Sequence, residues 1–194
     1  KEHFKPILAG YARSRMKEHA FSTWLDFEIS CKNWLEVFRI LRQELRRDPR
    51  LLHKAFPMLT KYAFSKEEIA SVLPDLTSAW LTCAHLSRKA GNEEDAVYFL
   101  ENALEFIEQE PQLRPHYFMQ VFQHYRRLKK EEEAAEVLRE GIRHISDYAP
   151  FHIYLGDYYK GQDLTYRAEE EYRQALVIQP DNAAAQQRLQ QMAP

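Results

Sequence analysis

Apolar residues recur at helical spacing near the C-terminal end of this 194-residue chain. Ala168, Tyr172 and Ala175 fall at positions i, i+4 and i+7, so they would share one face of an α-helix. Gly156 and Tyr159 fall at helical spacing a little earlier. The small residues would let two helices approach closely, and the tyrosines would fill the space beside them. The pattern predicts a hairpin of two amphipathic helices.

The same pattern occurs three times. Thirty-four residues separate Ala134 from Ala168, and 38 separate Ala96 from Ala134, which is one repeat plus the four-residue insertion 111–114. One hairpin cannot bury its apolar face alone, so we expect the repeats to stack. The predicted repeats, called repeats one to three, are residues 77–110, 115–148 and 149–182.

The residues at fixed places in these repeats carry a resemblance to the tetratricopeptide repeat family. Repeat three has the family's residue types at Leu155, Gly156, Tyr159, Ala168, Tyr172, Ala175 and Pro180, and departs from them at His152. Repeat one has them at Trp80, Ala84, Gly91, Ala96, Leu100 and Ala103. Repeat two has them at Phe118, Tyr125, Ala134, Leu138 and Gly141. The resemblance implies an all-α superhelix of antiparallel hairpins with about ten helices.

The flanking regions fit one continuous repeat domain over residues 1–194, with a weak boundary near 73–77. Residues 1–76 predict degenerate N-terminal helices, including a helix over 51–62 that Pro57 should kink or split. Ser65 is a typical N-cap for a short helix ending near residue 73. Residues 183–194 predict a capping helix, because they are rich in glutamine and have only a thin apolar stripe.

Composition supports an ordered helical protein. Five glycines would serve the many tight turns of a sandwich or barrel poorly, and the net charge of −2 favours neither nucleic acid nor an anionic membrane as partner. We interpret Cys31 and Cys83 as two buried small residues, with a disulfide left open. No apolar run is long enough to span a bilayer. Because the chain begins with lysine, we expect an excised or processed piece.

The sequence contains no recognisable catalytic motif, so we predict a non-catalytic chain without metal or cofactor. His116 and His124 could share a helix face, but they lack a further ligand at suitable spacing, so surface or groove positions are the favoured interpretation. The acidic runs 131–133 and 169–171 open or occupy the second helix of a hairpin. Carboxylates near the N-terminus of a helix interact favourably with the helix dipole, which accounts for these runs. Arg46, Arg47 and Arg50 are interpreted in the same way as cations at a helix C-terminus.

The predicted binding surface is the concave groove, which in tetratricopeptide arrays is lined by the first helix of each hairpin. Such a groove, basic in its middle and aromatic at its edges, suits an acidic peptide or helix from a partner protein. Ordinary exposed side chains are the alternative interpretation. The predicted groove residues are His85, Arg88, Lys89, Gln120, Gln123, Arg126, Arg127, Tyr154 and Asp157.

Two narrower resemblances bear on the partner. Co-chaperone members of the family hold a C-terminal carboxylate with lysine and asparagine, whereas the corresponding places here hold residues such as Leu81, Gln120 and Pro150, so a chaperone tail is not expected. Residues 155–182 also resemble repeat tails of bacterial O-antigen ligases or polymerases. That parentage implies a catalytic membrane portion upstream and a periplasmic location; otherwise the location is expected to be cytoplasmic.

Under the O-antigen parentage, this chain would be an accessory domain that assists glycan assembly. Aromatic rings can stack on sugars, so the exposure of Trp24, Trp34 and Trp80 tests whether the domain contacts the glycan itself.

Overall fold

The computed structural model describes residues 17–192, with side chains from residue 21 onward, and these residues form eleven α-helices, two 3₁₀ helices and no strand. The predicted all-α class is confirmed. The chain divides between Glu110 and Pro111 into two compact units, here called unit 1 and unit 2. The predicted single domain over 1–194 stays a prediction, and its first sixteen residues lie outside the described part of the chain.

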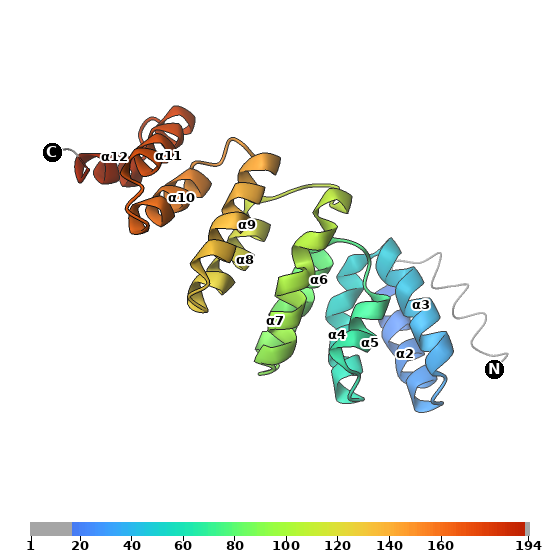
Figure 1. Ribbon diagram of the computed structural model, residues 1–194. Coiled ribbons are helices and arrows are strands. Elements are labelled where there is room, and N and C mark those ends of the chain that lie inside the picture. Colours follow the sequence, from blue (N-terminus) through green and yellow to red (C-terminus); the bar gives the residue numbers. More distant parts are fainter. Residues whose placement is uncertain (1–16, 193–194) are drawn as a thin grey trace. The chain divides into compact units, whose positions relative to one another are not determined.

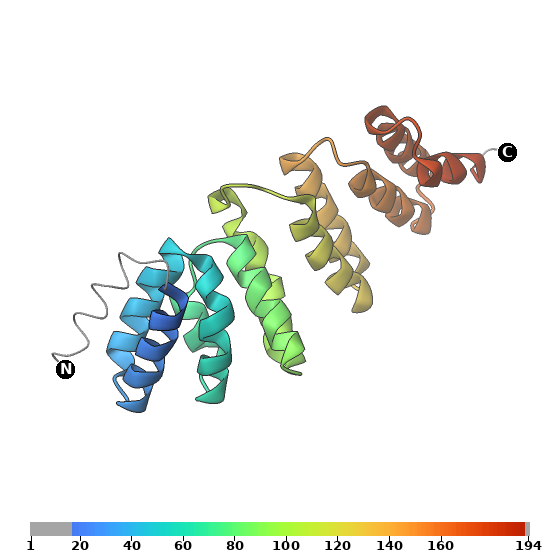
Figure 2. The ribbon, with the colours of Figure 1, turned by 180° about the vertical axis from the view of Figure 1, so that it is seen from behind.

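Unit 1 consists of two rows of helices (Figure 1). Its elements are α2 (Lys17–Ser30), α3 (Trp34–Arg47), η1 (Pro49–Leu51), α4 (Leu52–Lys61), α5 (Lys66–Val72), α6 (Thr77–Lys89), α7 (Glu93–Asn102) and η2 (Ala103–Gln109). The first helices α2, α4 and α6 lie side by side in that order, and the second helices α3, α5 and α7 do the same. Figure 2 shows the first row as the blue, turquoise and green helices on the near side of unit 1. The degenerate N-terminal sequence therefore forms hairpins like the regular repeats.

Unit 2 continues the hairpin pattern and ends with a single helix. Its elements are α8 (Pro115–Arg127), α9 (Glu131–His144), α10 (Ala149–Gly161), α11 (Thr165–Ile178) and α12 (Ala183–Gln190). Each packs on the element next to it in sequence. On α12, Ala185 is fully buried in a cluster with Ile153 and Ala175. The predicted capping helix therefore covers the apolar edge of the last hairpin.

Every hairpin turn contains one residue with left-handed backbone dihedrals. These residues are Lys32 (φ 55°), Ala63 (φ 59°), Gly91 (φ 82°), Lys129 (φ 57°) and Asp163 (φ 58°). Only one is glycine, although glycine adopts this conformation most readily. The turn geometry therefore repeats along the chain even where its usual sequence signal is missing.

Close helix approaches occur where the small residues predict them. A Cβ on Gly156 would lie 2.5 Å from the ring of Tyr172, and a Cβ on Gly141 would lie 2.9 Å from the ring of Phe151. Both rings are fully buried. In unit 1, Trp80 stacks on Phe106 with 4.9 Å between ring centroids.

One local prediction requires correction, a second is narrowed and a third is confirmed. Cys31 is exposed rather than buried, because it lies in the turn after α2; Cys83 is buried, and both thiols are free. Of the two outcomes predicted for Pro57, a kink or a split, the split does not occur, since α4 continues through Pro57 to Lys61. Ser65 caps α5 as predicted, in a reciprocal capping box with Glu68.

Candidate functional site

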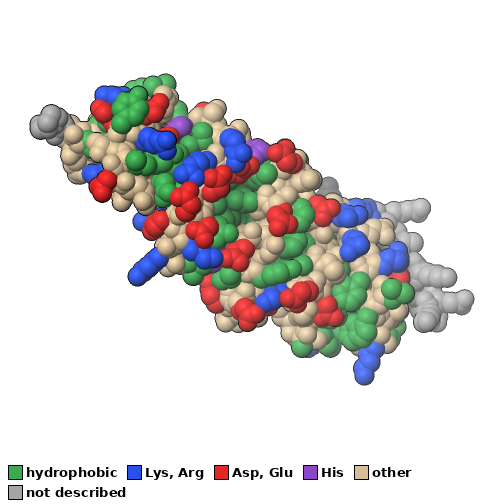
Figure 3. Space-filling view, in the orientation of Figure 1, with side chains coloured by type: hydrophobic (Ala, Val, Ile, Leu, Met, Phe, Trp, Pro, Cys, Tyr) green, Lys and Arg blue, Asp and Glu red, His purple; other side chains and the backbone are tan. Residues whose placement is uncertain are grey.

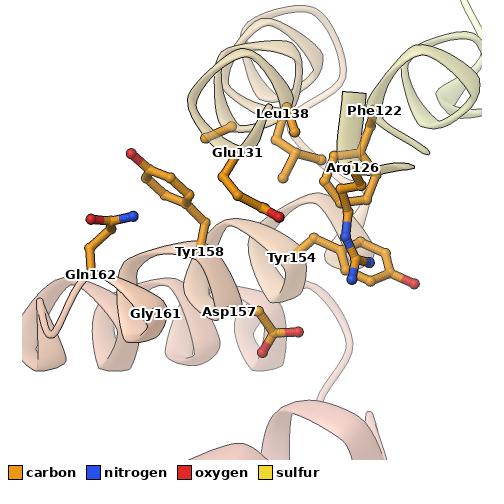
Figure 4. A pocket seen from close by; sticks show the side chains of 11 residues that line it. Phe122, Arg126, Glu131, Leu138, Tyr154, Asp157, Tyr158, Gly161 and Gln162 are labelled. Carbon is orange, nitrogen blue, oxygen red and sulfur yellow. The ribbon is translucent and has the colours of Figure 1, made fainter. Parts of the chain in front are cut away.

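Unit 2 contains a hollow of about 220 Å³ between α8, α9 and α10, which we call the unit 2 pocket (Figure 4). Helix α8 contributes its C-terminal half, α9 its first two turns, and α10 its middle and C-terminal end. The lining residues are Phe122, Arg126, Glu131, Ala134, Ala135, Leu138, Tyr154, Asp157, Tyr158, Gly161 and Gln162.

Aromatic and aliphatic side chains form the walls of the pocket. The rings of Phe122 and Tyr154 lie 5.0 Å apart at a tilt of 40°, and thereby join α8 to α10. Leu138 and Ala134 of α9 are buried beneath them. These positions follow from helical spacing, since Ala134 and Leu138 are four residues apart and share a face. The result is an apolar surface held by three helices.

Arg126 brings a positive charge to this apolar surface. Its guanidinium lies 5.5 Å from the centroid of the Phe122 ring, close enough for a cation–π contact. Arg126 also lines a second hollow together with Gln123 and Arg127. Within the described chain neither arginine forms an ion pair, whereas Arg139, Arg143, Arg173 and Arg188 of the same unit all contact carboxylates. The charges of Arg126 and Arg127 are therefore available to a partner.

The carboxylate of Asp157 forms hydrogen bonds with other residues of unit 2. Its carboxylate accepts hydrogen bonds of 2.8 Å from the Tyr172 hydroxyl and 2.8 Å from Nη2 of Arg188. It therefore ties α10 to α11 and α12. Burial, and then the hydrogen bond to Asp157, raise the pKa of the Tyr172 phenol above its usual range. These contacts give Asp157 a structural role, and its predicted role in the groove stays a prediction.

A polar network fixes α9 against α10 beside the pocket. The Tyr158 hydroxyl donates to Glu132, which also contacts Arg139 at 3.0 Å. The Arg139 guanidinium lies 5.7 Å from the centroid of the Tyr158 ring. Hydrogen bonds from Tyr158 and Arg139 hold the pKa of Glu132 below its usual range, since they favour the charged carboxylate. The acidic run therefore includes a specific contact between helices in addition to its place at the start of α9.

The predicted groove residues are divided between the two units. His85, Arg88 and Lys89 are exposed on α6 in unit 1, where Arg88 contacts Glu93 at 3.2 Å. The other six belong to unit 2, and only Arg126, Tyr154 and Asp157 line the unit 2 pocket. Gln120 is exposed on α8 and lines neither hollow described above.

Sequence reasoning missed Phe122, Glu131 and Tyr158 as pocket residues. Phe122 lies one helical turn after Phe118, so its spacing indicates core alone. Tyr158 precedes Tyr159, which the repeat pattern assigns to packing, and nothing in the sequence tells which ring faces the pocket.

The two histidines considered as metal ligands lie in different environments. His124 is buried and its ring lies 5.4 Å from that of Tyr125, whereas His116 is exposed and contacts Tyr117. Partial burial, and then the charge of Arg114, lower the pKa of His116. Residues 17–192 contain no cluster of three or more His, Cys, Asp or Glu placed to hold a metal.

Within residues 17–192, no helix has the length and apolarity needed to span a membrane.

Comparison with known proteins identifies the architecture. No family model and no curated protein matches the chain. Among solved structures, the chain is similar to YrrB, described as a tetratricopeptide repeat protein with an unusual peptide-binding site, with a TM-score of 0.52, 14% identity and coverage of 95% of this chain and 97% of YrrB. A double mutant of MamA RS-1 gives a TM-score of 0.51 at 15% identity, with coverage of 82% of this chain and 83% of that one.

This chain has the tetratricopeptide repeat fold. At these identities the likeness establishes the architecture alone, and it agrees with the resemblance carried by Gly156, Ala168 and Tyr172. None of the comparisons supports the O-antigen parentage, which stays a prediction.

The exposure of the tryptophans gives glycan contact little support. Trp24 and Trp80 are buried at 1% and 8% relative exposure, while Trp34 is 38% exposed and its ring packs edge-on against Phe64 at 5.3 Å. Two of the three indole rings therefore serve packing inside unit 1.

Proposed function

We propose that this chain is a non-catalytic scaffold that binds a peptide segment of a partner protein at the unit 2 pocket. The observation that carries the proposal is the unpaired Arg126 guanidinium at the edge of an aromatic hollow. An apolar or aromatic side chain of the peptide enters the hollow, and a neighbouring aspartate or glutamate pairs with Arg126.

The size and lining of the pocket favour a single side chain as occupant. Pockets that enclose drug-sized molecules measure about 300–1,000 Å³, whereas this hollow measures about 220 Å³. Its lining contains no serine, cysteine, threonine or histidine, so neither a serine–histidine nor a cysteine–histidine pair is present there. Binding is therefore the function that these groups support.

The helices around the pocket are held before any partner arrives. Glu132, Tyr158 and Arg139 join α9 to α10, and the contact between Phe122 and Tyr154 joins α8 to α10. A preformed site loses little conformational entropy when a ligand binds, which favours affinity.

Selection of peptides from a random displayed library on the immobilised protein tests this proposal. The selected peptides are expected to share an acidic residue next to an aromatic or aliphatic one. Their affinities are then measured by fluorescence anisotropy for the wild type, Arg126→Gln and Tyr154→Ala. Arg114→Gln is the matched control, because it removes the same charge from an exposed position of the same unit.

Arg126 is exposed, and an exposed charge pair contributes about 0.2–1 kcal/mol, so Arg126→Gln should weaken binding by up to about fivefold. Arg114→Gln should leave the affinity unchanged. Equal affinities for the wild type and Arg126→Gln, or selected peptides without acidic residues, would overturn the proposal.

A further inference from the structure

The second helix of the last hairpin, α11, carries two large apolar side chains on its outer surface. Tyr166 is 75% exposed and Val177 is 74% exposed. Three other residues of α11 are fully buried and lie on the opposite side of the helix, namely Ala168, Tyr172 and Ala175. Packing inside unit 2 therefore leaves the side with Tyr166 and Val177 uncovered.

Glu170 and Arg173 lie between the two apolar side chains on the same side of α11. The spacing from Tyr166 through these two residues to Val177 is four, three and four residues, so all four fall within an arc of about 60°. This is the spacing of the core positions of a coiled coil, in which two helices meet along one seam. Figure 3 shows hydrophobic side chains beside acidic and basic ones on the surface over α11. These four residues are called the α11 stripe.

Both charges of the α11 stripe are accessible to a partner. The carboxylate of Glu170 is exposed and forms no ion pair or hydrogen bond within residues 21–192. The Arg173 side chain is 62% exposed and contacts Glu169, one turn earlier in the helix. A guanidinium has five N–H donors, so Arg173 can bind a second carboxylate while it keeps this contact.

The α11 stripe is complementary to itself when a second copy of the helix runs antiparallel to the first. A two-fold axis that places Tyr166 opposite Val177 of the second copy also places Glu170 opposite Arg173 of the second copy. Both pairs are centred on the same point of the helix, between residues 171 and 172. Each inner position then joins a carboxylate to a guanidinium, and each end joins two apolar side chains. A parallel arrangement would instead place like charges opposite each other.

Helix α9, the other second helix of unit 2, has charges at the same spacing but no such stripe. The charged residues there are Glu132, Glu136, Arg139 and Arg143. Both arginines form ion pairs with glutamates of α9 itself. Among residues 131–144 no large apolar side chain is exposed. The charges of α9 are therefore satisfied within one chain, whereas α11 presents apolar ends beside an unpaired carboxylate.

We propose that the α11 stripe is a homodimer contact, in which α11 packs antiparallel against α11 of a second copy of this chain. The two pairs of Glu170 with Arg173 set the register of the helices. Contact of the Tyr166 ring with Val177 buries apolar surface at both ends of the seam. Helix α11 contributes no residue to the unit 2 pocket, so the contact is independent of the proposed peptide site.

The dimer is weak because its contact is small. The α11 stripe is about 17 Å long, at about 1.5 Å per residue. One pair of helices over this length buries less than the roughly 1,600 Å² of a standard interface. We therefore expect the chain to be monomeric when dilute and to dimerise reversibly at high micromolar concentrations.

Sedimentation velocity of the full chain over a concentration series at low salt tests the proposal. Glu170→Arg and Arg173→Glu each place like charges opposite each other in the dimer, so each variant alone should associate about tenfold or more weakly than the wild type. An equimolar mixture of the two variants should dimerise with about the affinity of the wild type. In that heterodimer the introduced arginine meets the introduced glutamate, and the remaining Arg173 meets the remaining Glu170.

The control pair is Glu133→Arg and Arg114→Glu, which makes the same changes of charge at exposed positions of unit 2 outside α11. Each control variant alone should associate like the wild type. All four substituted side chains are exposed, so folding should be unaffected, and far-UV circular dichroism checks this. A wild type that stays monomeric at every concentration would overturn the proposal. So would a dimer that both α11 variants retain, or a mixture of these variants that fails to associate.

Discussion

The contact between Gly156 and Tyr172 gives the sharpest test of how the last hairpin is packed. An alanine Cβ at position 156 would lie 2.5, 2.8 and 3.0 Å from three carbons of the Tyr172 ring. Carbon atoms in favourable contact are about 3.5–4.0 Å apart, so the ring would have to move by about 1 Å. The ring is fully buried and its hydroxyl is held by Asp157, so little room for movement exists.

The size of the effect follows from three contributions. Overpacking a core costs about 1–3 kcal/mol, and disturbing a hydrogen bond to a charged acceptor costs about 1.5–3 kcal/mol. Replacing glycine by alanine inside a helix stabilises the folded state by about 1 kcal/mol, because alanine has the higher helix propensity. We therefore expect Gly156→Ala to lower the free energy of unfolding of unit 2 by about 1.5–5 kcal/mol.

Gly161 provides a control on the same helix. Nothing lies within 4 Å of a Cβ built there, so Gly161→Ala should be neutral or slightly stabilising. Urea titrations followed by far-UV circular dichroism report both units, while tryptophan fluorescence reports unit 1 alone, because Trp24, Trp34 and Trp80 all belong to it. Equal stability of Gly156→Ala and the wild type, or equal losses in the two variants, would refute the packing argument.

Two further predictions concern thiol reactivity and alkaline pH. Under native conditions only Cys31 should react rapidly with a thiol reagent, because Cys83 is buried and burial raises the pKa of its thiol. Rapid reaction of a second thiol before urea is added would contradict this prediction. Tyr172→Phe should make stability less sensitive to alkaline pH. The raised pKa of Tyr172 means that its phenol ionises first in the unfolded chain, so the wild type loses stability as the pH rises above the ordinary tyrosine value of about 10. Urea titrations at pH 7 and 11 should show a smaller loss in the variant, and identical losses would be inconsistent with the buried hydroxyl.

The regular repeats could be predicted from sequence because their signal is local. The spacing of Gly156, Ala168 and Tyr172 specifies which faces meet and how closely, and helices α10 and α11 lie on either side of that contact. The capping box of Ser65 and Glu68 is equally local, since both partners lie within four residues.

Features that depend on distant partners could not be predicted in this way. Asp157 pairs with Arg188, which lies 31 residues away, so no local pattern in the sequence indicates this contact. The stretch 103–109 tightens into a 3₁₀ helix where Phe106 lies against Trp80, an arrangement that helical periodicity does not encode. The unit 2 pocket arises where three helices leave space, and side-chain packing decides this.

The packing of each element only on near neighbours in sequence has a consequence for how the chain acquires its structure. Contacting helices are consecutive α-helices or α-helices with one other between them, so the sequence separation between them stays short. Chains of this kind fold rapidly, and their early segments need not wait for distant ones. Within each unit, a hairpin that leaves the ribosome can therefore dock on the hairpin made before it, and the arrival of α12 covers the apolar edge formed by Ile153 and Ala175.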